Sequence, residues 1–428
     1  MRRLGRQGAP ASHEMSPQDA AWLGLEHPTN LMVVTAVLLL DGRPDVEALR
    51  ALVQHRMVDR YPSFRRRVVG TEGFWSRARW QDDPDFDLAA HIRTINLTGP
   101  ISTHLEPFIA NLMGRALPLS RSPWSMHLID DPVGCSALVV RVHHCVADGI
   151  ALAAVLLSLT DSQNPDDNSA AAKSGVNRPK ATAATLLITS CRVVSALLRI
   201  LQMSHEPPSR LRTALGTRKR VGLGKGVDLA VVKAQAGGAS VNDAVLAAVA
   251  GGLRRELVCG GEDPKDLRVL VPVDLRPRGA AVPASLGNRF GMIVLRLPVA
   301  AGEAHQRLAQ VQRRTSRAKS SVEAVATFAG LTVLGFMPRV IQSLAVRVLG
   351  SRVTGVVTNV PGPRHPVLLA GHRVARIAFW VPQTGDVGVG ISVFSYAGRV
   401  SVGVALDAGL SVDPSVLAQA IEAELCGQ

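Results

Sequence analysis

The seven residues from His143 to Gly149, with the sequence HHCVADG, carry the side chains best suited to chemistry in this chain. A neutral imidazole can take a proton from a hydroxyl group near pH 7, so a histidine in this run is a candidate general base. Asp148 followed by Gly149 permits a sharp return of the chain, because glycine adopts backbone angles that other residues avoid. The run therefore predicts a proton-accepting histidine next to a tight turn.

The segments on either side of this run must hold the histidine in place. Residues 135–144 (CSALVVRVHH) are rich in β-branched residues, which predicts a strand, and residues 149–159 (GIALAAVLLSL) predict an apolar helix. Neighbouring residues on a strand face opposite sides, so His143 and His144 cannot both project into one site. This argues against a metal site made of both imidazoles and leaves one catalytic and one packing histidine. A core histidine without a chemical role is the alternative interpretation.

Strand-like and helix-like segments alternate through the rest of the chain, which predicts a mixed α/β fold of the α+β type. Ser16 followed by Pro17 is typical of the start of a helix. Pro107 is expected in the first turn of a helix over 107–115, where its missing N–H costs little. The further predicted helices are 46–58, 241–258, 303–320 and 414–425, and the further predicted strands are 31–40, 75–80, 267–273, 291–297, 388–394 and 400–406.

The amino-acid composition narrows the class of protein. The 428 residues are 47% hydrophobic and 19% charged, which excludes an intrinsically disordered chain. Aromatic residues make up only 4%, which argues against a nucleic-acid reader that stacks bases. The five cysteines form no CxxC pair and are interpreted as free thiols in a reducing compartment. The basic N-terminus shows no apolar region of the kind found in a secretory signal.

The net charge of +14 is concentrated in one segment. Residues 173–225 hold eleven basic residues and one acidic residue, Glu206, and therefore carry +10 of that charge. Because the rest of the chain is close to neutral, the pattern predicts a local anionic contact and no nucleic-acid partner. A solvated linker without any such contact is the alternative interpretation.

Two apolar segments approach the length of a membrane span without reaching the ~20 apolar residues that a span requires. Residues 183–203 are interrupted by Arg192 and Arg199, and residues 324–337 are interrupted by glycines. The first segment favours an amphipathic helix that lies on a membrane surface, because its two arginines share one face and its flanks are basic. A helix packed in the core is the alternative.

Changes in composition along the chain indicate its division into domains. The stretch 161–171 (DSQNPDDNSAA) is polar and rich in turn residues, as linkers are. Similar elements precede and follow it, which predicts two lobes joined by a basic crossover. The predicted divisions are an N-terminal arm at 1–14, a first lobe at 15–160, a basic linker with an amphipathic helix at 161–225 and a second lobe at 226–428.

The HHCVADG run resembles the HHxxxDG signature of the bacterial wax ester synthase/acyl-CoA:diacylglycerol acyltransferase (WS/DGAT) family, within the chloramphenicol-acetyltransferase-like superfamily. Several acyltransferase and condensation families share HHxxxDG, so the resemblance also depends on further blocks in the right order. Blocks similar to those of the family lie at 16–30, 64–67, 83–93, 122–130, 241–246 (VNDAVL), 286–291 (LGNRFG) and 358–363 (TNVPGP). The resemblance implies two chloramphenicol-acetyltransferase-like lobes with mixed sheets.

The resemblance also implies a mechanism. In the family the second histidine of the motif is the general base, a role that falls on His144. It would deprotonate the hydroxyl of a diacylglycerol or of a long-chain alcohol, which then attacks the thioester of acyl-CoA. No metal, cofactor or covalent acyl-enzyme is implied, and the chain has no GxSxG motif. His143 would pack, Asp148 would pair with an arginine and fix the histidine loop, and Gly149 would form the turn.

Four more residues are expected at the substrate cleft from the resemblance. Asn242 and Asp243 would line it from the second lobe, with Asn242 as a donor to developing charge. A helix N-cap pair explains these two residues equally well, and both roles can hold. Pro123 and Trp124 belong to a block similar to the family's PLW block, which here lacks its leucine. Ser120 stands where the pattern has aspartate, and these departures concern the acyl pocket more than proton transfer.

The implied function is an O-acyltransferase that makes triacylglycerol or wax ester, located in the cytoplasm and bound peripherally to a membrane or lipid droplet. The cations of residues 173–225 would contact anionic lipid headgroups or the phosphates of CoA. Two alternatives stay open. One is a related acyltransferase that uses a carrier-protein thioester or a non-lipid acceptor, and the other is a catalytically degenerate protein that binds lipid surfaces.

Overall fold

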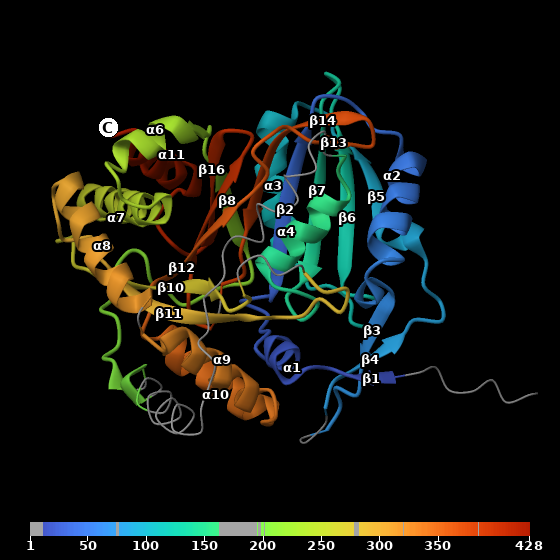
Figure 1. The fold of residues 1–428 in the computed structure, drawn as a ribbon, viewed down its shortest axis with the longest axis horizontal. Coiled ribbons are helices and arrows are strands. Elements are labelled where there is room, and N and C mark those ends of the chain that lie inside the picture. Colours follow the sequence, from blue (N-terminus) through green and yellow to red (C-terminus); the bar gives the residue numbers. More distant parts are fainter. Residues whose placement is uncertain are drawn as a thin grey trace, which may run out of the picture.

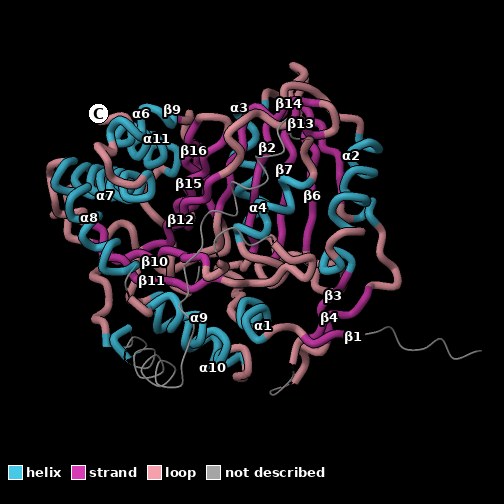
Figure 2. Tube along the Cα trace, in the orientation of Figure 1, coloured by secondary structure: helices cyan, strands magenta, loops and turns pink. Residues whose placement is uncertain are grey.

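The computed structural model describes residues 12–73, 77–161, 195, 198–200, 202–277, 282–319, 321–383 and 385–428. Two large mixed sheets form the two halves of the molecule (Figure 1), and helices pack against both of them (Figure 2). This architecture confirms the predicted mixed α/β fold. Among the described helices, none combines the length and the apolar character that crossing a bilayer demands.

The first large sheet has the strand order β13-β14-β2-β7-β6-β5. The alternation of side chains along β2 builds a core on each face of this sheet. Val34, Ala36 and Leu38 face a core shared with α4, whereas Val37 faces a core shared with α3. The elements of this half are β2 (Val33–Leu40), α2 (Val46–Val53), a π-helical turn (Gln54–Val58), β5 (Ile92–Asn96), α3 (Ile101–Met113), β6 (Trp124–Asp130), β7 (Ser136–His143), α4 (Gly149–Ser158), β13 (Leu368–Leu369) and β14 (His372–Trp380).

The second large sheet has the order β11-β10-β12-β15-β16-β8, and β9 also pairs with β16. Val269 and Val271 of β10 face a core with α7, whereas Leu270 faces a core with α1 and α10. The elements of this half are β8 (Lys219–Leu223), β9 (Val227–Asp228), α6 (Leu229–Gln235), α7 (Val241–Cys259), β10 (Leu267–Asp274), β11 (Phe290–Leu297), α8 (Ala304–Lys319), α9 (Glu323–Leu334), α10 (Arg339–Gly350), β12 (Gly355–Pro361), β15 (Val389–Tyr396), β16 (Arg399–Asp407) and α11 (Pro414–Leu425).

A short N-terminal helix and a small sheet lie at the lower edge of the view in Figure 1. The helix is α1 (Pro17–Gly24), which Ser16 caps by accepting a hydrogen bond from the backbone N–H of Asp19. The small sheet has the order β1-β4-β3, with two 3-10 turns in the same region of the chain. The bounds are β1 (Ser12–Glu14), Pro62–Arg65, β3 (Arg66–Val69), β4 (Arg79–Asp82) and Leu88–Ala90.

Two strands of the second half of the sequence, β13 and β14, belong to the first sheet. β14 pairs antiparallel with β2, from Val374 opposite Leu40 to Trp380 opposite Thr35. The predicted division at residue 226 therefore does not separate the strands of the two sheets. The local sequence does not show which sheet a strand joins, because a buried strand has the same apolar pattern in either sheet.

The helix expected at 107–115 begins earlier, and this prediction was wrong. Pro107 lies inside α3 (Ile101–Met113) and not in its first turn. Four apolar residues at helical spacing, Ile101, Leu105, Ile109 and Leu112, are buried along one face of α3. Their packing outweighs the hydrogen bond that the proline ring removes.

The end of the predicted basic linker is part of the folded structure. The amphipathic helix expected at 183–203 falls almost entirely outside the described residues. β8 is an edge strand of the second large sheet, and its Lys219 forms a buried ion pair with Asp407 at 2.9 Å. Lys219 is therefore a structural cation and not an exposed one.

Three arginines of the same segment also have internal partners. Arg210 donates to the carbonyl oxygen of Glu256 at 3.0 Å, and Arg220 donates to that of Val412 at 2.6 Å. Arg212 donates to the carbonyl oxygen of Val353. The guanidinium groups of these residues therefore stabilise the fold.

Candidate active site

The HHCVADG run forms the connection between β7 and α4, as the sequence predicted. The backbone N–H of His144 donates to the carbonyl of Met32 at 2.6 Å, and that of Val146 donates to the carbonyl of His143 at 3.0 Å. Asp148 caps α4 by accepting a hydrogen bond from the backbone N–H of Ala151 at 2.9 Å. The turn is thus fixed by backbone hydrogen bonds at its start and by the side chain of Asp148 at its end.

The two adjacent histidines point to different partners. His143 is fully buried, and its Nε2–H donates to Glu26 at 2.8 Å. Its other ring nitrogen, Nδ1, accepts a hydrogen bond from the backbone N–H of Cys145 at 3.1 Å. Both nitrogens of His143 are occupied, so this ring has no free lone pair to offer a substrate.

His144 is held by an asparagine from the other half of the chain. Its Nδ1 lies 2.8 Å from Oδ1 of Asn288. The Nδ2 group of Asn288 donates to Asp19 and to the backbone carbonyl of His144, both at 2.7 Å. Because both amide hydrogens have acceptors, the amide oxygen must be the atom that faces the ring.

This arrangement decides which nitrogen of His144 can act as a base. An amide oxygen only accepts, so Nδ1 must carry the proton and the lone pair resides on Nε2. Within the described ranges, no residue makes a hydrogen bond to Nε2 of His144. The ring is thus held as the tautomer that a proton acceptor at Nε2 requires.

Asp19 supports Asn288 from α1. Its Oδ1 accepts hydrogen bonds from both the backbone N–H and the side-chain amide of Asn288, at 3.0 and 2.7 Å. Its Oδ2 accepts from the hydroxyl of Ser16 at 2.6 Å. Burial raises the pKa of Asp19 to about 6. A continuous hydrogen-bonded chain therefore runs from Ser16 through Asp19 and Asn288 to His144.

The surroundings of His144 favour its neutral form. The indole of Trp22 stacks on the imidazole with 4.4 Å between ring centroids, and Phe290 lies at 5.5 Å. Burial lowers the pKa of His144 to about 4. The imidazole is therefore unprotonated near pH 7 and ready to accept a proton.

Asp148 has the arginine partner that the resemblance led us to expect. Arg276 reaches its two carboxylate oxygens at 2.6 and 3.2 Å, and both side chains are buried. Arg276 also pairs with Asp274 at 3.0 Å. The backbone N–H of Arg289 donates to Asp148 at 2.9 Å. This ionic cluster ties the histidine turn of the first half to the second half of the chain.

The loop that carries Asn288 has unusual backbone geometry. Leu286 and Gly287 have φ angles of 53° and 89°, in the left-handed region. Gly287 forms a bridge with Ala147 of the histidine turn. The left-handed residues curl the loop around the turn, which brings Asn288 to the imidazole.

Gly149 does not make the turn that the sequence predicted. It is the first residue of α4, and it is absent from the glycines with positive φ. A side-chain carbon at this position would meet no atom within 4 Å. Gly149 instead lies at the wall of an apolar cavity beneath α4. The reversal is made by the hydrogen bonds of the residues before it.

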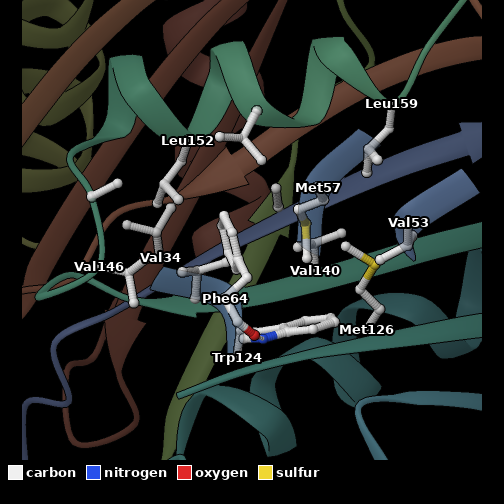
Figure 3. Packing of buried hydrophobic residues seen from close by; sticks show 14 of the residues in the cluster. Val34, Val53, Met57, Phe64, Trp124, Met126, Val140, Val146, Leu152 and Leu159 are labelled. Carbon is white, nitrogen blue, oxygen red and sulfur yellow. Dashed lines mark hydrogen bonds between the residues drawn. The ribbon is translucent and has the colours of Figure 1, made fainter. Parts of the chain in front are cut away.

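Two small apolar cavities lie between α4 and the first large sheet. One has a volume of about 40 Å³ and the other about 20 Å³, and both are lined by apolar side chains. They share Val34, Ala36, Leu152 and Leu156. Figure 3 shows Leu152 pointing from α4 toward Val34 and Phe64. This apolar space lies beneath the helix that Asp148 caps.

Trp124 is the first residue of β6, and Pro123 precedes it directly. Trp124 is buried, stacks on His91 at 4.4 Å, and donates its indole N–H to the carbonyl of Phe64 at 2.8 Å. The carbonyl of Pro123 accepts a hydrogen bond from the backbone N–H of His143 at 3.0 Å. Both residues support the cavity wall and β7, and neither is among the residues that line the cavities.

Asn242 and Asp243 lie in the first turn of α7. Ser240 is the N-cap, and its hydroxyl donates to Asp243 at 2.6 Å. The other carboxylate oxygen of Asp243 accepts from Thr315 of α8 at 2.7 Å. In the part of the chain that is described, no hydrogen bond links this group to the chain of residues that ends at His144. The N-cap is therefore Ser240 and not the pair Asn242 and Asp243, and Asp243 stabilises the cap from the first turn of the helix.

Sequence reasoning missed several residues of the site. Asn288, Asp19, Trp22, Arg276 and Glu26 received no role. Asp19 and Trp22 are three residues apart on one helix, a spacing that places both on the same face. Neither their partner His144 nor the link to Asn288 could be found from local patterns. No group of three or more metal-ligating side chains occurs among the residues that are described.

Comparison with known proteins now connects this geometry to a family. The profile of the wax ester synthase/diacylglycerol acyltransferase catalytic domain matches residues 15–245, and that of the WS/DGAT C-terminal domain matches residues 286–426. A "probable diacylglycerol O-acyltransferase tgs1" from Mycobacterium tuberculosis is 29% identical over 421 residues, which cover 91% of this chain and 90% of that protein.

Solved structures show the same fold. The wax ester synthase/diacylglycerol acyltransferase from Marinobacter aquaeolei VT8 superposes with a TM-score of 0.69 at 22% identity, over 96% of this chain and 98% of that one. The first condensation domain of the calcium-dependent antibiotic synthetase gives a TM-score of 0.62 at 18% identity, over 97% and 96% of the two chains. The expected two-lobe fold is confirmed. The chain belongs to the wax ester synthase/diacylglycerol acyltransferase family and is an acyltransferase.

Proposed function

We propose that this protein transfers a long-chain acyl group from acyl-CoA to the free hydroxyl of diacylglycerol, and also to long-chain alcohols. The observation that carries the proposal is the state of His144. Asn288 fixes the proton on Nδ1, and burial keeps the ring neutral, so Nε2 is a base without a partner among the described residues. Such a nitrogen is suited to deprotonate an acceptor hydroxyl.

The proposed reaction needs no covalent enzyme intermediate. Nε2 of His144 takes the proton of the acceptor hydroxyl while the oxygen attacks the thioester carbonyl carbon. The tetrahedral intermediate then collapses, the carbon–sulfur bond breaks, and the thiolate of CoA takes the proton back from the imidazolium. The products are the ester and free CoA, and the imidazole returns to its neutral state.

The neighbouring cysteine does not offer a competing nucleophile. Cys145 is buried, and burial raises the pKa of its thiol well above the ordinary value. A protonated thiol is a poor nucleophile, because the thiolate is the reactive form. This supports direct transfer between the two substrates. The apolar cavities beneath α4 would hold part of a hydrocarbon chain.

The decisive experiment incubates the purified protein with palmitoyl-CoA and either diolein or hexadecanol. Thiol release and the ester product are both measured. His144→Ala should lower the rate by about 10²–10⁴-fold, the usual contribution of a general base. His55→Ala is the matched control, since the side chain of His55 is 79% exposed. Equal product from wild type and His144→Ala would contradict the proposal.

The same assay separates the two alternatives. If the protein turned over an acyl carrier protein thioester but not acyl-CoA, the acyl donor would be the carrier-protein thioester and not acyl-CoA. Absence of turnover on every acceptor, with lipid binding intact, would favour a degenerate lipid-binding protein. We further propose that the enzyme works at the surface of a membrane or lipid droplet, where its acceptors are found.

A further inference from the structure

An exposed apolar surface lies on the hairpin formed by α9 and α10. Ten large apolar side chains are exposed in the described part of the chain, and five of them fall between residues 333 and 344. Soluble surfaces usually scatter such residues singly, so a cluster indicates an interaction site. The five are Val333 (60% exposed), Phe336 (45%), Val340 (67%), Ile341 (45%) and Leu344 (61%).

The hairpin is held firmly by its inner face. α10 buries Gln342, Val346 and Gly350, which are four residues apart and form one stripe. The amide of Gln342 donates to the carbonyl oxygens of Leu334 and Met337 at 3.1 and 2.8 Å, which fixes the turn between the helices. The apolar outer face is therefore presented by a structured element, beside α1 at the lower edge of Figure 1.

Basic side chains line the cavity next to this apolar face. The cavity has a volume of about 320 Å³ and lies between α1, the hairpin and the small sheet. Arg77, Arg79 and Arg339 line it, together with one acidic residue, Glu14. Arg77 also lies over the ring of Phe336 at 5.2 Å. Within the described ranges, none of the three arginines forms an ion pair.

We propose that the α9–α10 hairpin and these three arginines form a docking surface for an anionic phospholipid interface. The apolar side chains would enter the boundary between headgroups and acyl chains, and the arginines would pair with lipid phosphates. The charge favours this occupant over a second copy of the chain, because two such faces would bring like charges together. This proposal adds a membrane contact to the proposed function. It rests on that function only for the identity of the lipid hydroxyl that the enzyme acylates.

The surface also changes the sequence-based expectation of where a membrane would bind. That expectation favoured residues 183–203 over residues 324–337. Four basic residues that follow the first segment have partners inside the fold, whereas the second segment forms most of α9 and the turn of the exposed hairpin. The proposal therefore adds the second segment and α10 to the expected lipid contacts, and residues 183–203 lie almost entirely outside the described residues.

Flotation with vesicles tests the proposal. The full chain is mixed with vesicles of phosphatidylcholine alone or of phosphatidylcholine with phosphatidylglycerol. Wild type should float with the anionic vesicles, and added salt should reduce the floated fraction. The triple variant Val340→Ser, Ile341→Ser, Leu344→Ser should lose at least tenfold in vesicle partitioning. The triple variant Val133→Ser, Val258→Ser, Val416→Ser is the control, since these valines are exposed elsewhere.

A second set of variants tests the charge. Arg77→Gln, Arg79→Gln, Arg339→Gln together should remove the preference for anionic vesicles. Arg65→Gln, Arg93→Gln, Arg364→Gln should leave it intact, because these exposed arginines lie away from the cavity. Thermal melts confirm that each variant is folded.

The possible outcomes separate this proposal from the proposed function. Acylation of a short, water-soluble alcohol should stay unchanged in the hairpin variants, since the hairpin does not touch His144. Flotation of the serine variant at the wild-type level would overturn the docking surface. So would a serine variant that loses self-association in sedimentation velocity but still floats. Loss of soluble-alcohol turnover in His144→Ala would still support the proposed function in either case.

Discussion

The histidine turn and the start of α7 are built from similar parts but end differently. Each places a buried aspartate at the beginning of a helix, and each aspartate contacts residues far away in the sequence. At α7, the carboxylate of Asp243 is matched by the hydroxyls of Ser240 and Thr315, and the network closes. At the histidine turn, the network runs through Asn288 and stops at a nitrogen of His144 with no described partner.

This difference bears on how the proposed catalytic region can be distinguished from a structural one. Residue type does not distinguish the two, since both contain buried carboxylates and hydrogen-bonded polar groups. The difference is Nε2 of His144, a basic nitrogen that the protein orients through Asn288 and that has no hydrogen-bond partner among the described residues. Variants that remove one hydrogen bond or ion pair from either network therefore test whether this atom distinguishes the two regions.

The largest expected effect is on the charged part of the histidine turn. Arg276→Met would leave Asp148 and Asp274 buried without their cation. Removal of one partner of a buried pair costs about 3–5 kcal/mol in the free energy of unfolding. Urea denaturation should show that loss. The control Arg296→Met removes a pair whose arginine is 67% exposed, and its cost should stay below about 1 kcal/mol. Equal losses of unfolding free energy in Arg276→Met and Arg296→Met would show that the buried ion pairs at the turn stabilise the fold no more than an exposed pair does.

Asn288→Ala should have the next largest effect, on rate more than on stability. It removes the acceptor that holds the proton on Nδ1 of His144. The loss of such a hydrogen bond, about 1–3 kcal/mol, corresponds to roughly 5–150-fold in kcat. Thiol-release kinetics should show this with a smaller change in KM. Thr315→Val is the matched control, because it removes one hydrogen bond to Asp243 from the α7 network and should leave kcat unchanged. A similar fall in kcat in this variant would contradict the distinction between the two regions.

Asp243→Ala should affect stability and spare catalysis. It removes the acceptor of the Ser240 and Thr315 hydroxyls, and the buried Thr315 hydroxyl keeps only the carbonyl oxygen of Gln312 at 3.2 Å. We expect a loss of about 1–3 kcal/mol in unfolding free energy. The activity of the folded fraction should equal that of wild type. A fall in kcat at unchanged stability would instead place the start of α7 in the substrate cleft.

The smallest expected effect is a shift in the titration of His144. Burial under Trp22 and Phe290 lowers its pKa from 6.5 to about 4. Between these values the unfolded imidazole binds a proton that the folded one does not, so His144 makes the fold less stable as the pH falls through that window. Trp22→Ala should raise the pKa toward 6.5 by admitting water. Nuclear magnetic resonance of the labelled imidazole measures the midpoint, and an unchanged midpoint would show that the stacked ring does not control it.

Local patterns predicted a large part of the fold. The helix expected at 414–425 has the bounds of α11, because its proline start and apolar spacing are local signals. The strand and helix around the HHCVADG run also lie within a residue of their expected bounds. Pro107 was misplaced because tertiary burial of α3 overrode a local rule.

The hydrogen bonds through which Asn288 and Asp19 hold His144 could not be predicted in the same way. Asn288 is 144 residues from His144, and Asp19 is 269 residues from Asn288. Contacts at such separation depend on how the two sheets pack, and no periodicity records them. The motif blocks that contain these residues were visible in the sequence, but their roles follow only from the folded geometry.

The position of β14 has a consequence for the synthesis of the protein. β2 obtains one neighbour from residues 136–143 and the other only from residues 372–380. While the nascent chain is shorter than that, the apolar strand VVTAVLLL has one edge without a partner. Open edges of this kind recruit strands from other chains. A ribosome must therefore translate most of the message before the first sheet is protected, and truncated products should aggregate.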